Sequence, residues 1–529
     1  MKKISLLLVL ASFGLTALAQ PPVQDISNHL ELQGAFYTDL EFPGEGAVKG
    51  SVGDFNNDGI DDFFITGLYV ANGANKSFFH IYLGQEGDIP KLVYQDNEFI
   101  VGGNGATDCV KLVDGSWLVA VQGGKSGNWE NPFAAYLYNL SVDGETVTFS
   151  QVTQLDFATG RASILLLDMN KDGLFDIYQH GWKANASWDA TSTVYLNVDE
   201  TNEMFDLDPN SIIRPANNTL ATRGDLNNDG LEDILIPVQN LGLFVYLNKG
   251  DGTFSELKVT SFPVADRDDE ANIRGEEDGN QAQFVDVDGD GIPEIILSCV
   301  IDNTGGDWNF VLKLFKYNPA NQTFSEMAQT NKAGEPVVWT GGQRGDFAVG
   351  DFDGDGKVDI IVSAENQKEK TWGCRTYFMS GNGKGGFDQI EVTYGDANPN
   401  GIVAMSRRAQ FGRYLVGDFN GDGSLDLIQA GMNYYAKDPG LRLYLNKHTG
   451  TSIGNVDATD NIRVYADGRT LYVENVEQAE VSIINISGVI CQRSRISANE
   501  SLNLNVAAGV YVAKVRTEAG MVTKKIVVK

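Results

Sequence analysis

The sequence predicts an all-β protein, a seven-bladed β-propeller over residues 28–447 followed by a small β-sandwich over residues 461–529. Three observations predict this fold class. An acidic motif occurs six times, its later copies spaced by roughly 60 residues, a period typical of propellers and solenoids. Short apolar runs of strand length flank every copy, and no segment shows helical periodicity. Residues 448–460 are expected to be a linker.

The acidic motif reads D-x-[DN]-x-D-G-x-x-[DE] and begins at six aspartates in the chain: Asp54, Asp168, Asp225, Asp286, Asp351 and Asp418. Oxygen-bearing side chains at positions 1, 3, 5 and 9 suit a hard cation such as Ca²⁺, and position 7 would offer its carbonyl. The glycine at position 6 allows the tight turn. An EF-hand is excluded, because it would need a glutamate at position 12 and flanking helices.

The motif therefore predicts about six structural Ca²⁺ sites, and the alternative of simple Asx turns is disfavoured because so many uncompensated carboxylates would be costly. The predicted ligands are Asp54, Asn56, Asp58, Ile60 and Asp62; Asp168, Asn170, Asp172, Leu174 and Asp176; Asp225, Asn227, Asp229, Leu231 and Asp233; Asp286, Asp288, Asp290, Ile292 and Glu294; Asp351, Asp353, Asp355, Lys357 and Asp359; and Asp418, Asn420, Asp422, Ser424 and Asp426.

The spacing of the motifs predicts seven repeats rather than six. The first interval is twice the second, and residues 106–123 keep two strand-like runs around a plain Asp114-Gly115 turn. This segment is expected to be a second blade without a metal loop. The last repeat lacks a fourth strand, and residues 29–38 precede the first motif without a blade of their own. We expect these residues to complete the seventh blade and close the ring.

These repeats resemble the FG-GAP/VCBS type, the calcium-loop blades of integrin-like propellers and of some fungal sugar-binding lectins. The resemblance covers about residues 28–447 and implies that each metal loop joins the first and second strands of its blade. The loops joining second to third strands would then lie on the opposite face of the propeller.

The C-terminal segment resembles the sorting domain of type IX secretion cargo in Bacteroidetes. The matching features are Ser487-Gly488, the run Gly509–Val512 and the closing Lys524–Lys529. The usual Tyr-Pro-Asn-Pro opening is absent, and Val464-Tyr465-Ala466 stands in its place. The resemblance implies the type IX secretion machinery as a partner. A small adhesive β-sandwich is the alternative.

The N-terminus predicts export. Lys2-Lys3, an apolar run to Leu18 and the sequence Ala17-Leu18-Ala19 form a secretory signal peptide over residues 1–19, cleaved after Ala19. The mature protein is expected to be secreted or held at the outer cell surface. A net charge of −31 argues against a nucleic-acid partner, and no later apolar run is long enough for membrane insertion.

Aromatic residues in the second-to-third-strand loops are the candidate ligand site: Trp129, Trp182, Trp188, Trp308, Trp372 and Tyr434. Aromatic rings beside Asn, Asp and Gly commonly hold sugars, although packing between blades is an equal alternative. Evidence for catalysis is thin, and only His180, with Tyr178 nearby, could act as a general base. The sequence favours a non-enzymatic module that binds a glycan or surface protein. The alternatives are a polysaccharide lyase or hydrolase on the same propeller and a docking platform within a surface assembly.

Overall fold

The computed structural model is built from β-strands, with no helix among the residues it describes. The described residues are 30–36, 48–71, 74–125, 133–156, 158–182, 190–199, 201–202, 205–207, 213–216, 219–238, 241–260, 281–303, 307–368, 371–393, 401–402, 413–433, 438–446, 463–474, 478–485, 490–497, 501–506, 509–517 and 520–528. The predicted signal peptide and the expected linker lie outside these ranges.

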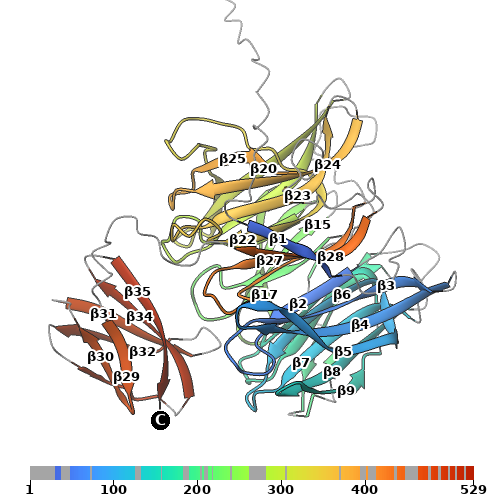
Figure 1. Ribbon diagram of the computed structural model, residues 1–529. Helices are drawn as coiled ribbons and strands as arrows, with labels where there is room; N and C mark the ends of the chain where they lie inside the picture. The colour runs from blue at the N-terminus through green and yellow to red at the C-terminus, as the bar shows by residue number, and fades with distance from the viewer. Residues whose placement is uncertain are drawn as a thin grey trace, which may run out of the picture.

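Seven four-stranded antiparallel sheets make up the region before residue 447, and six of them use four consecutive strands (Figure 1). The first three are β2 (Val48–Gly53), β3 (Asp62–Ala71), β4 (Ala74–Gln85) and β5 (Asp88–Phe99); β6 (Val101–Lys111), β7 (Trp117–Lys125), β8 (Phe133–Asp143) and β9 (Thr146–Gln154); and β10 (Gly160–Leu167), β11 (Asp176–Trp182), β12 (Ala190–Asn197) and β13 (Phe205–Leu207).

The next three sheets follow the same plan. They are β14 (Thr222–Gly224), β15 (Asp233–Val238), β16 (Gly242–Asn248) and β17 (Phe254–Thr260); β18 (Gln281–Val285), β19 (Glu294–Asn303), β20 (Asp307–Asn318) and β21 (Thr323–Glu326); and β22 (Gln343–Gly350), β23 (Asp359–Lys368), β24 (Thr371–Gly381) and β25 (Phe387–Glu391).

The seventh sheet joins the two ends of this region. Strands β26 (Arg413–Gly417), β27 (Asp426–Asn433) and β28 (Asp438–Asn446) are consecutive, and the fourth strand is β1 (Leu30–Phe36). Leu30 pairs with Asn446 and Phe36 with Leu441 in an antiparallel register. The first described strand of the chain thus covers the edge of the last strand before residue 447.

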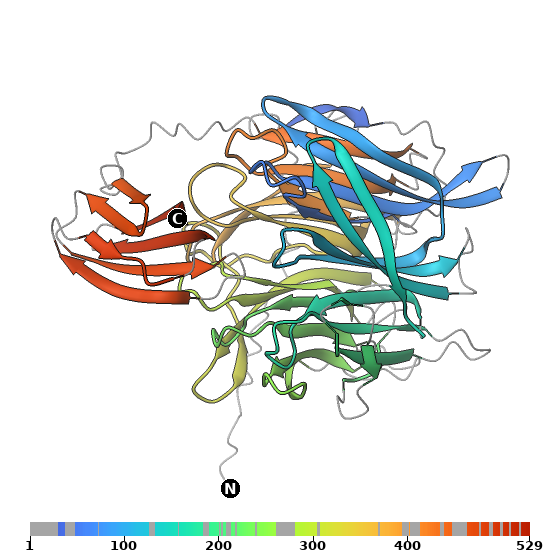
Figure 2. The same ribbon diagram turned by 90° about the horizontal axis from the view of Figure 1, so that it is seen from below.

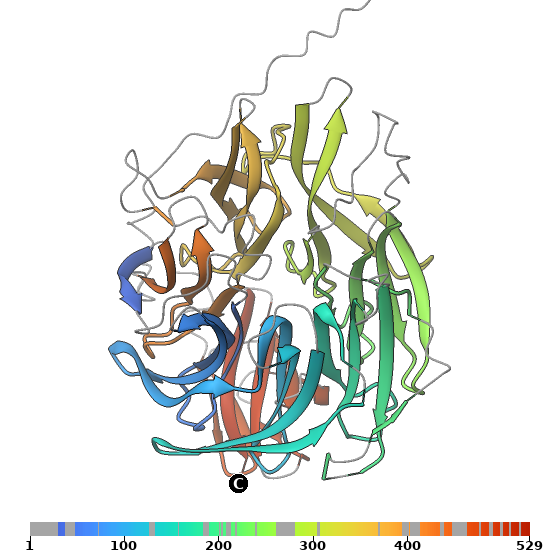
Figure 3. The ribbon, with the colours of Figure 1, turned by 90° about the vertical axis from the view of Figure 1, so that its right-hand side faces the viewer.

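Each sheet lies beside the next one along the chain, and the last sheet beside the first (Figures 2 and 3). A cluster of buried apolar residues joins each such pair of sheets. At the contact between last and first, the ring of Phe63 lies 5.5 Å from that of Phe419 in an edge-on geometry. Both residues are fully buried, and burying such a side chain contributes about 2–3 kcal/mol. Hydrophobic burial therefore stabilises every junction between sheets.

The C-terminal segment forms two sheets of its own. One contains β29 (Arg463–Asp467), β30 (Thr470–Glu474) and β33 (Ser501–Asn503); the other contains β31 (Gln478–Asn485), β32 (Ile490–Ser497), β34 (Gly509–Thr517) and β35 (Gly520–Val528). Alternate residues such as Val481 and Ile483 are fully buried in a separate apolar core. This segment therefore has a hydrophobic core independent of the seven sheets.

Candidate metal loops and ligand surfaces

The six acidic motifs form six loops of one design, each joining the first and second strands of a sheet. We call them the acidic loops and number their positions 1 to 9. They are residues 54–62, 168–176, 225–233, 286–294, 351–359 and 418–426. Each ends at the first residue of a second strand, so the strand pair on either side fixes the two ends of the loop.

Each acidic loop closes on itself through the same hydrogen bonds from backbone N–H groups to side-chain carboxylates. The Oδ2 atom of the position-1 aspartate accepts the N–H of the position-6 glycine, at 2.8 Å in the Asp225–Gly230 example. The position-5 aspartate accepts the N–H of position 7, at 2.9 Å between Asp229 and Leu231. Gly230 has φ of +86°, and Asn228 at position 4 has φ of +62°. Position 4 is Asn, Lys or Gly throughout, a second conformational requirement that the motif did not record.

The position-9 carboxylate connects the loop to the third strand of the sheet. Asp62 has no exposed surface; its Oδ2 accepts the N–H of Phe55 at 2.7 Å, and its Oδ1 accepts the N–H of Gly84 at 2.8 Å. Asp176, Asp233, Asp359 and Asp426 make the equivalent pair of bonds. Burial raises the pKa of Asp62 to about 7, against the effect of these donors. This side chain therefore has a structural role in addition to its predicted role as a ligand.

The donor atoms of the loops fit a hard cation. The Oδ1 atoms of Asp54 and Asp168, both at position 1, are buried and have no hydrogen-bond partner among the described residues. A buried, unpartnered carboxylate oxygen is costly unless a cation meets it. Two loops also bring three carboxylate oxygens within 4.8 Å of one another: Asp286, Asp288 and Asp290, and Asp351, Asp353 and Asp355. Oxygen-only donor sets of this kind are the ligands that Ca²⁺ prefers.

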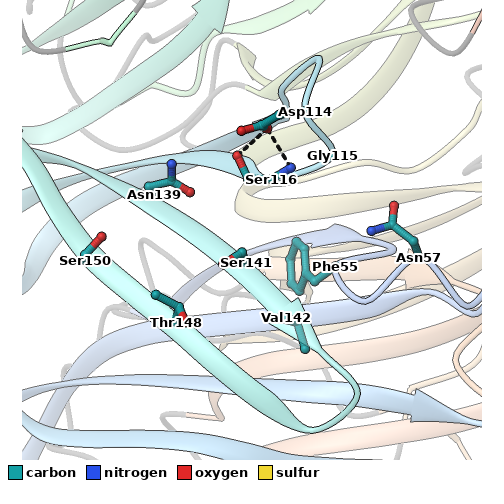
Figure 4. A pocket seen from close by; sticks show the side chains of 10 residues that line it. All are labelled: Phe55, Asn57, Asp114, Gly115, Ser116, Asn139, Ser141, Val142, Thr148 and Ser150. Carbon is teal, nitrogen blue, oxygen red and sulfur yellow. Dashed lines mark hydrogen bonds between the residues drawn. The ribbon is translucent and has the colours of Figure 1, made fainter.

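The second sheet has a plain turn where the others have an acidic loop. Asp114 Oδ1 accepts both the N–H of Ser116 at 2.9 Å and its hydroxyl at 2.6 Å, an ordinary Asx turn. Beside this turn lies a hollow of about 440 Å³ (Figure 4). Its lining is mostly hydroxyl and amide groups over the buried ring of Phe55, and comprises Phe55, Asn57, Asp114, Gly115, Ser116, Asn139, Ser141, Val142, Thr148 and Ser150. Figure 4 shows Asn139, Ser141, Thr148 and Ser150 along the β8–β9 hairpin.

The structure places the two candidate catalytic side chains in the core rather than at a loop surface. His180 and Tyr178 lie in β11 and have no exposed surface. The Tyr178 hydroxyl lies 3.0 Å from Nδ1 of His180, and Nε2 lies 3.0 Å from the carbonyl of Thr219. Burial lowers the pKa of His180 to about 4, so the ring is neutral at pH 7. In this arrangement neither side chain reaches solvent, and His180 serves as a hydrogen-bonded core residue.

Three of the six aromatic candidates belong to the described residues. Each of these three lies at the end of a strand, beside the hairpin that joins the second and third strands of its sheet. Trp182 ends β11, pairs with Ala190 and is half-buried. Trp308 and Trp372 lie in β20 and β24 and pair with Asp302 and Gln367. Trp129, Trp188 and Tyr434 lie outside the described residues. Three of the six candidates thus belong to extended strands, which the Gly- and Asn-rich sequence around them did not indicate.

Two family models match parts of the chain. FG-GAP-like repeats match residues 225–297 and 286–362, and a secretion system C-terminal sorting domain matches residues 458–529. No curated protein shows significant sequence similarity to the chain. The described residues contain no helix with the length and hydrophobicity that a membrane crossing needs.

Several solved structures show distant similarity. An α-L-arabinofuranosidase from Fusarium graminearum is 10% identical, with 69% of this chain and 97% of that one covered and a TM-score of 0.39. A fungal alcohol oxidase in complex with copper is 13% identical, with 95% and 100% covered and a TM-score of 0.47. A Trypanosoma rangeli sialidase is 9% identical, with 92% and 83% covered and a TM-score of 0.33. Similarity this remote assigns no activity.

The sorting domain accounts for the separate C-terminal core and implies a route of export. Proteins that carry it interact with the type IX secretion machinery and reach the medium or the outer surface. The acidic loops from residue 225 to residue 359 lie within the matched repeats. The chain is therefore a secreted or outer-surface protein that carries FG-GAP-like repeats followed by a C-terminal sorting domain of the type IX secretion system.

Proposed function

We propose that this protein is a calcium-stabilised, non-enzymatic binding module, a seven-bladed propeller that holds a glycan or a surface protein outside the cell. In this proposal the seven four-stranded sheets are the blades, β1 closes the seventh blade, and the second blade has lost its metal loop. The packing of every sheet on its neighbour, including the last on the first, supports this arrangement.

The acidic loops carry the calcium part of the proposal. The observation that supports it best is the pair of buried, unpartnered oxygens on Asp54 and Asp168, since loop hydrogen bonds leave these atoms without a donor. A bound Ca²⁺ would offset two of the three or four negative charges that the ligand carboxylates of each loop can carry. The residues that would hold it are those at positions 1, 3, 5 and 9, together with the carbonyl at position 7.

Ligand binding is assigned to the face opposite the acidic loops. In the sheets that carry Trp182, Trp308 and Trp372, these residues stand at strand ends beside the second-to-third-strand hairpins, away from the first-to-second-strand loops. Aromatic rings at such a rim can stack on sugar rings while neighbouring polar groups bind the hydroxyls. The burial of His180, the general base that the sequence offered, supports binding rather than catalysis in this proposal.

Two measurements test the proposal. Melting of the full chain in excess calcium and in excess chelator should differ, because an ion that binds only the folded state stabilises it. A glycan array, read with wild type and with Trp182→Ala, should show signal that the variant loses. The Ser141→Ala, Thr148→Ala double variant in the hollow of Figure 4 is the matched control and should keep it. An unchanged melting temperature would refute the calcium role, and cleavage of an array glycan would refute the non-enzymatic assignment.

A further inference from the structure

Position 3 divides the six acidic loops into two kinds. Four loops have asparagine there, and its amide donates to the position-5 aspartate; Asn56 Nδ2, for example, lies 2.8 Å from Asp58 Oδ2. The same bond occurs from Asn170, Asn227 and Asn420. Loops 286–294 and 351–359 have aspartate at position 3. These two loops carry a fourth carboxylate and lack the amide donor that would separate two of the charges.

A residue of the third strand changes together with position 3. The residue directly after each loop lies in the second strand and pairs with a residue of the third strand. The next residue of the third strand, which follows this partner, differs between the two kinds of loop. In the four asparagine loops this residue is always leucine: Leu83, Leu196, Leu247 and Leu445. In the two aspartate loops it is Lys316 or Ser380. At this position of the third strand, a polar or charged residue therefore occurs only in the two sheets whose loop has gained a carboxylate.

Lys316 contacts three of the four carboxylates in its loop. Its ammonium group donates to Asp288 Oδ2 and, at 2.9 Å, to Asp290 Oδ2. These are positions 3 and 5, which the asparagine amide links directly in the other four loops. The ammonium group also lies 3.4 Å from Oε1 of Glu294. Among the described residues that oxygen has no hydrogen-bond donor, whereas the other five position-9 side chains use the corresponding oxygen to accept a third-strand N–H.

The second aspartate loop is arranged differently. Ser380 donates to Asp353 Oδ2 at 2.6 Å, and Lys357 donates to Asp355 Oδ2 at 2.8 Å. Lys332 lies 3.9 Å and 3.8 Å from these two carboxylates. In the part of the chain that the structure describes, each of these lysines contacts one or two of the loop's carboxylates, whereas Lys316 contacts three in loop 286–294.

We propose that the ammonium group of Lys316 is the resident cation of loop 286–294, so that this loop closes without calcium and binds it more weakly than the asparagine loops do. This inference rests on the proposed calcium role of the other loops. An ammonium group and a metal ion cannot occupy the centre of the same carboxylate cluster, so calcium must displace Lys316. Two like charges held a few ångströms apart repel strongly even near a protein surface.

Replacing Lys316 by methionine keeps most of the side-chain stem and removes the charge. Calcium titration of the chelator-treated full chain by calorimetry should then show one more tight site in Lys316→Met than in wild type, with affinity at that loop higher by roughly tenfold or more. Lys313→Met is the matched control. Lys313 lies in the same strand, and the contact that the described residues give its ammonium group is with Glu326, at 2.8 Å and outside the acidic loops, so its loss should leave the count unchanged.

Melting provides an independent readout. In chelator, Lys316→Met should melt below wild type, because its four carboxylates are left without a cation, and calcium should restore it more than it stabilises wild type. Lys316→Gln serves the same purpose if the methionine variant does not fold. Equal ion counts and equal calcium-induced shifts in Lys316→Met and wild type would overturn the role of Lys316 alone. Absence of calcium binding by every variant, wild type included, would overturn both this inference and the proposed function.

Discussion

Acidification should destabilise the protein through His180, a side chain buried in β11. Its ring is hydrogen-bonded at both nitrogens in the neutral form, and burial lowers its pKa to about 4 from the ordinary value of 6.5. The unfolded chain therefore takes up this proton at a higher pH than the folded one does. The stability that depends on a neutral His180 is present above pH 6.5 and is lost as the pH falls toward 4.

The size of the effect follows from the two pKa values. Between pH 7 and pH 5 the unfolded state becomes almost fully protonated at this histidine, while the folded state stays almost neutral. The linkage relation gives a loss of about 2 kcal/mol in the free energy of unfolding over this interval. His180→Gln removes the titration, and its amide offers a donor for Thr219 and an acceptor for Tyr178.

Urea unfolding of both proteins at pH 5, 6 and 7 in excess calcium measures the difference. The carboxylates of the acidic loops titrate in both proteins, so their contribution cancels in the comparison. Wild type should lose about 2 kcal/mol more than His180→Gln between pH 7 and pH 5. Parallel pH dependences in the two proteins would show that His180 is protonated without cost, which contradicts its burial.

Three further changes have defined outcomes. Arg223→Met removes the cation that lies 3.0 Å from Glu232 and 3.4 Å from Asp108. Urea unfolding should show a free energy of unfolding lower by about 3 kcal/mol. An unchanged urea midpoint would mean that these carboxylates find other partners. A Cβ atom at Gly230 would meet no atom within 4 Å, but the alanine of Gly230→Ala must adopt a φ of +86°. The same assay should show a loss of about 1–2 kcal/mol in the free energy of unfolding. An unchanged free energy would refute the backbone strain. Deletion of residues 458–529 should keep the chain in the periplasm of a bacterium with a type IX system, as cell fractionation would show; export of the truncated chain would contradict the role of the sorting domain.

The sequence was sufficient to predict the features that repeat locally. The acidic motif has fixed spacing because a nine-residue loop must return its ninth residue to the second strand, and glycine at position 6 is required by its positive φ. The all-β class followed from the same spacing and from the short apolar runs. These features depend on residues close together in the chain, where pattern and geometry are directly connected.

The features that the sequence did not reveal depend on distant contacts. Lys316 lies in β20, whereas the loop that it contacts precedes β19. The register between these two strands brings its ammonium group to Asp288. His180 precedes Gly181-Trp182, which looks like a loop, yet the carbonyl of Thr219, just before β14 of the next sheet, accepts a hydrogen bond from its ring. Local sequence carries no signal for either arrangement, although a comparison of equivalent positions among the repeats would have singled out Lys316.

The pairing of β1 with β28 also sets an order of events during folding. The edge of β28 remains open until β1 returns across the whole repeat region, and closing so long a loop is slow and entropically unfavourable. Until then an unpaired strand edge is exposed, and β1 of a second copy can pair with it in the same register. At high protein concentration we therefore expect strand-exchanged dimers, which an N-terminal truncation removing β1 would abolish.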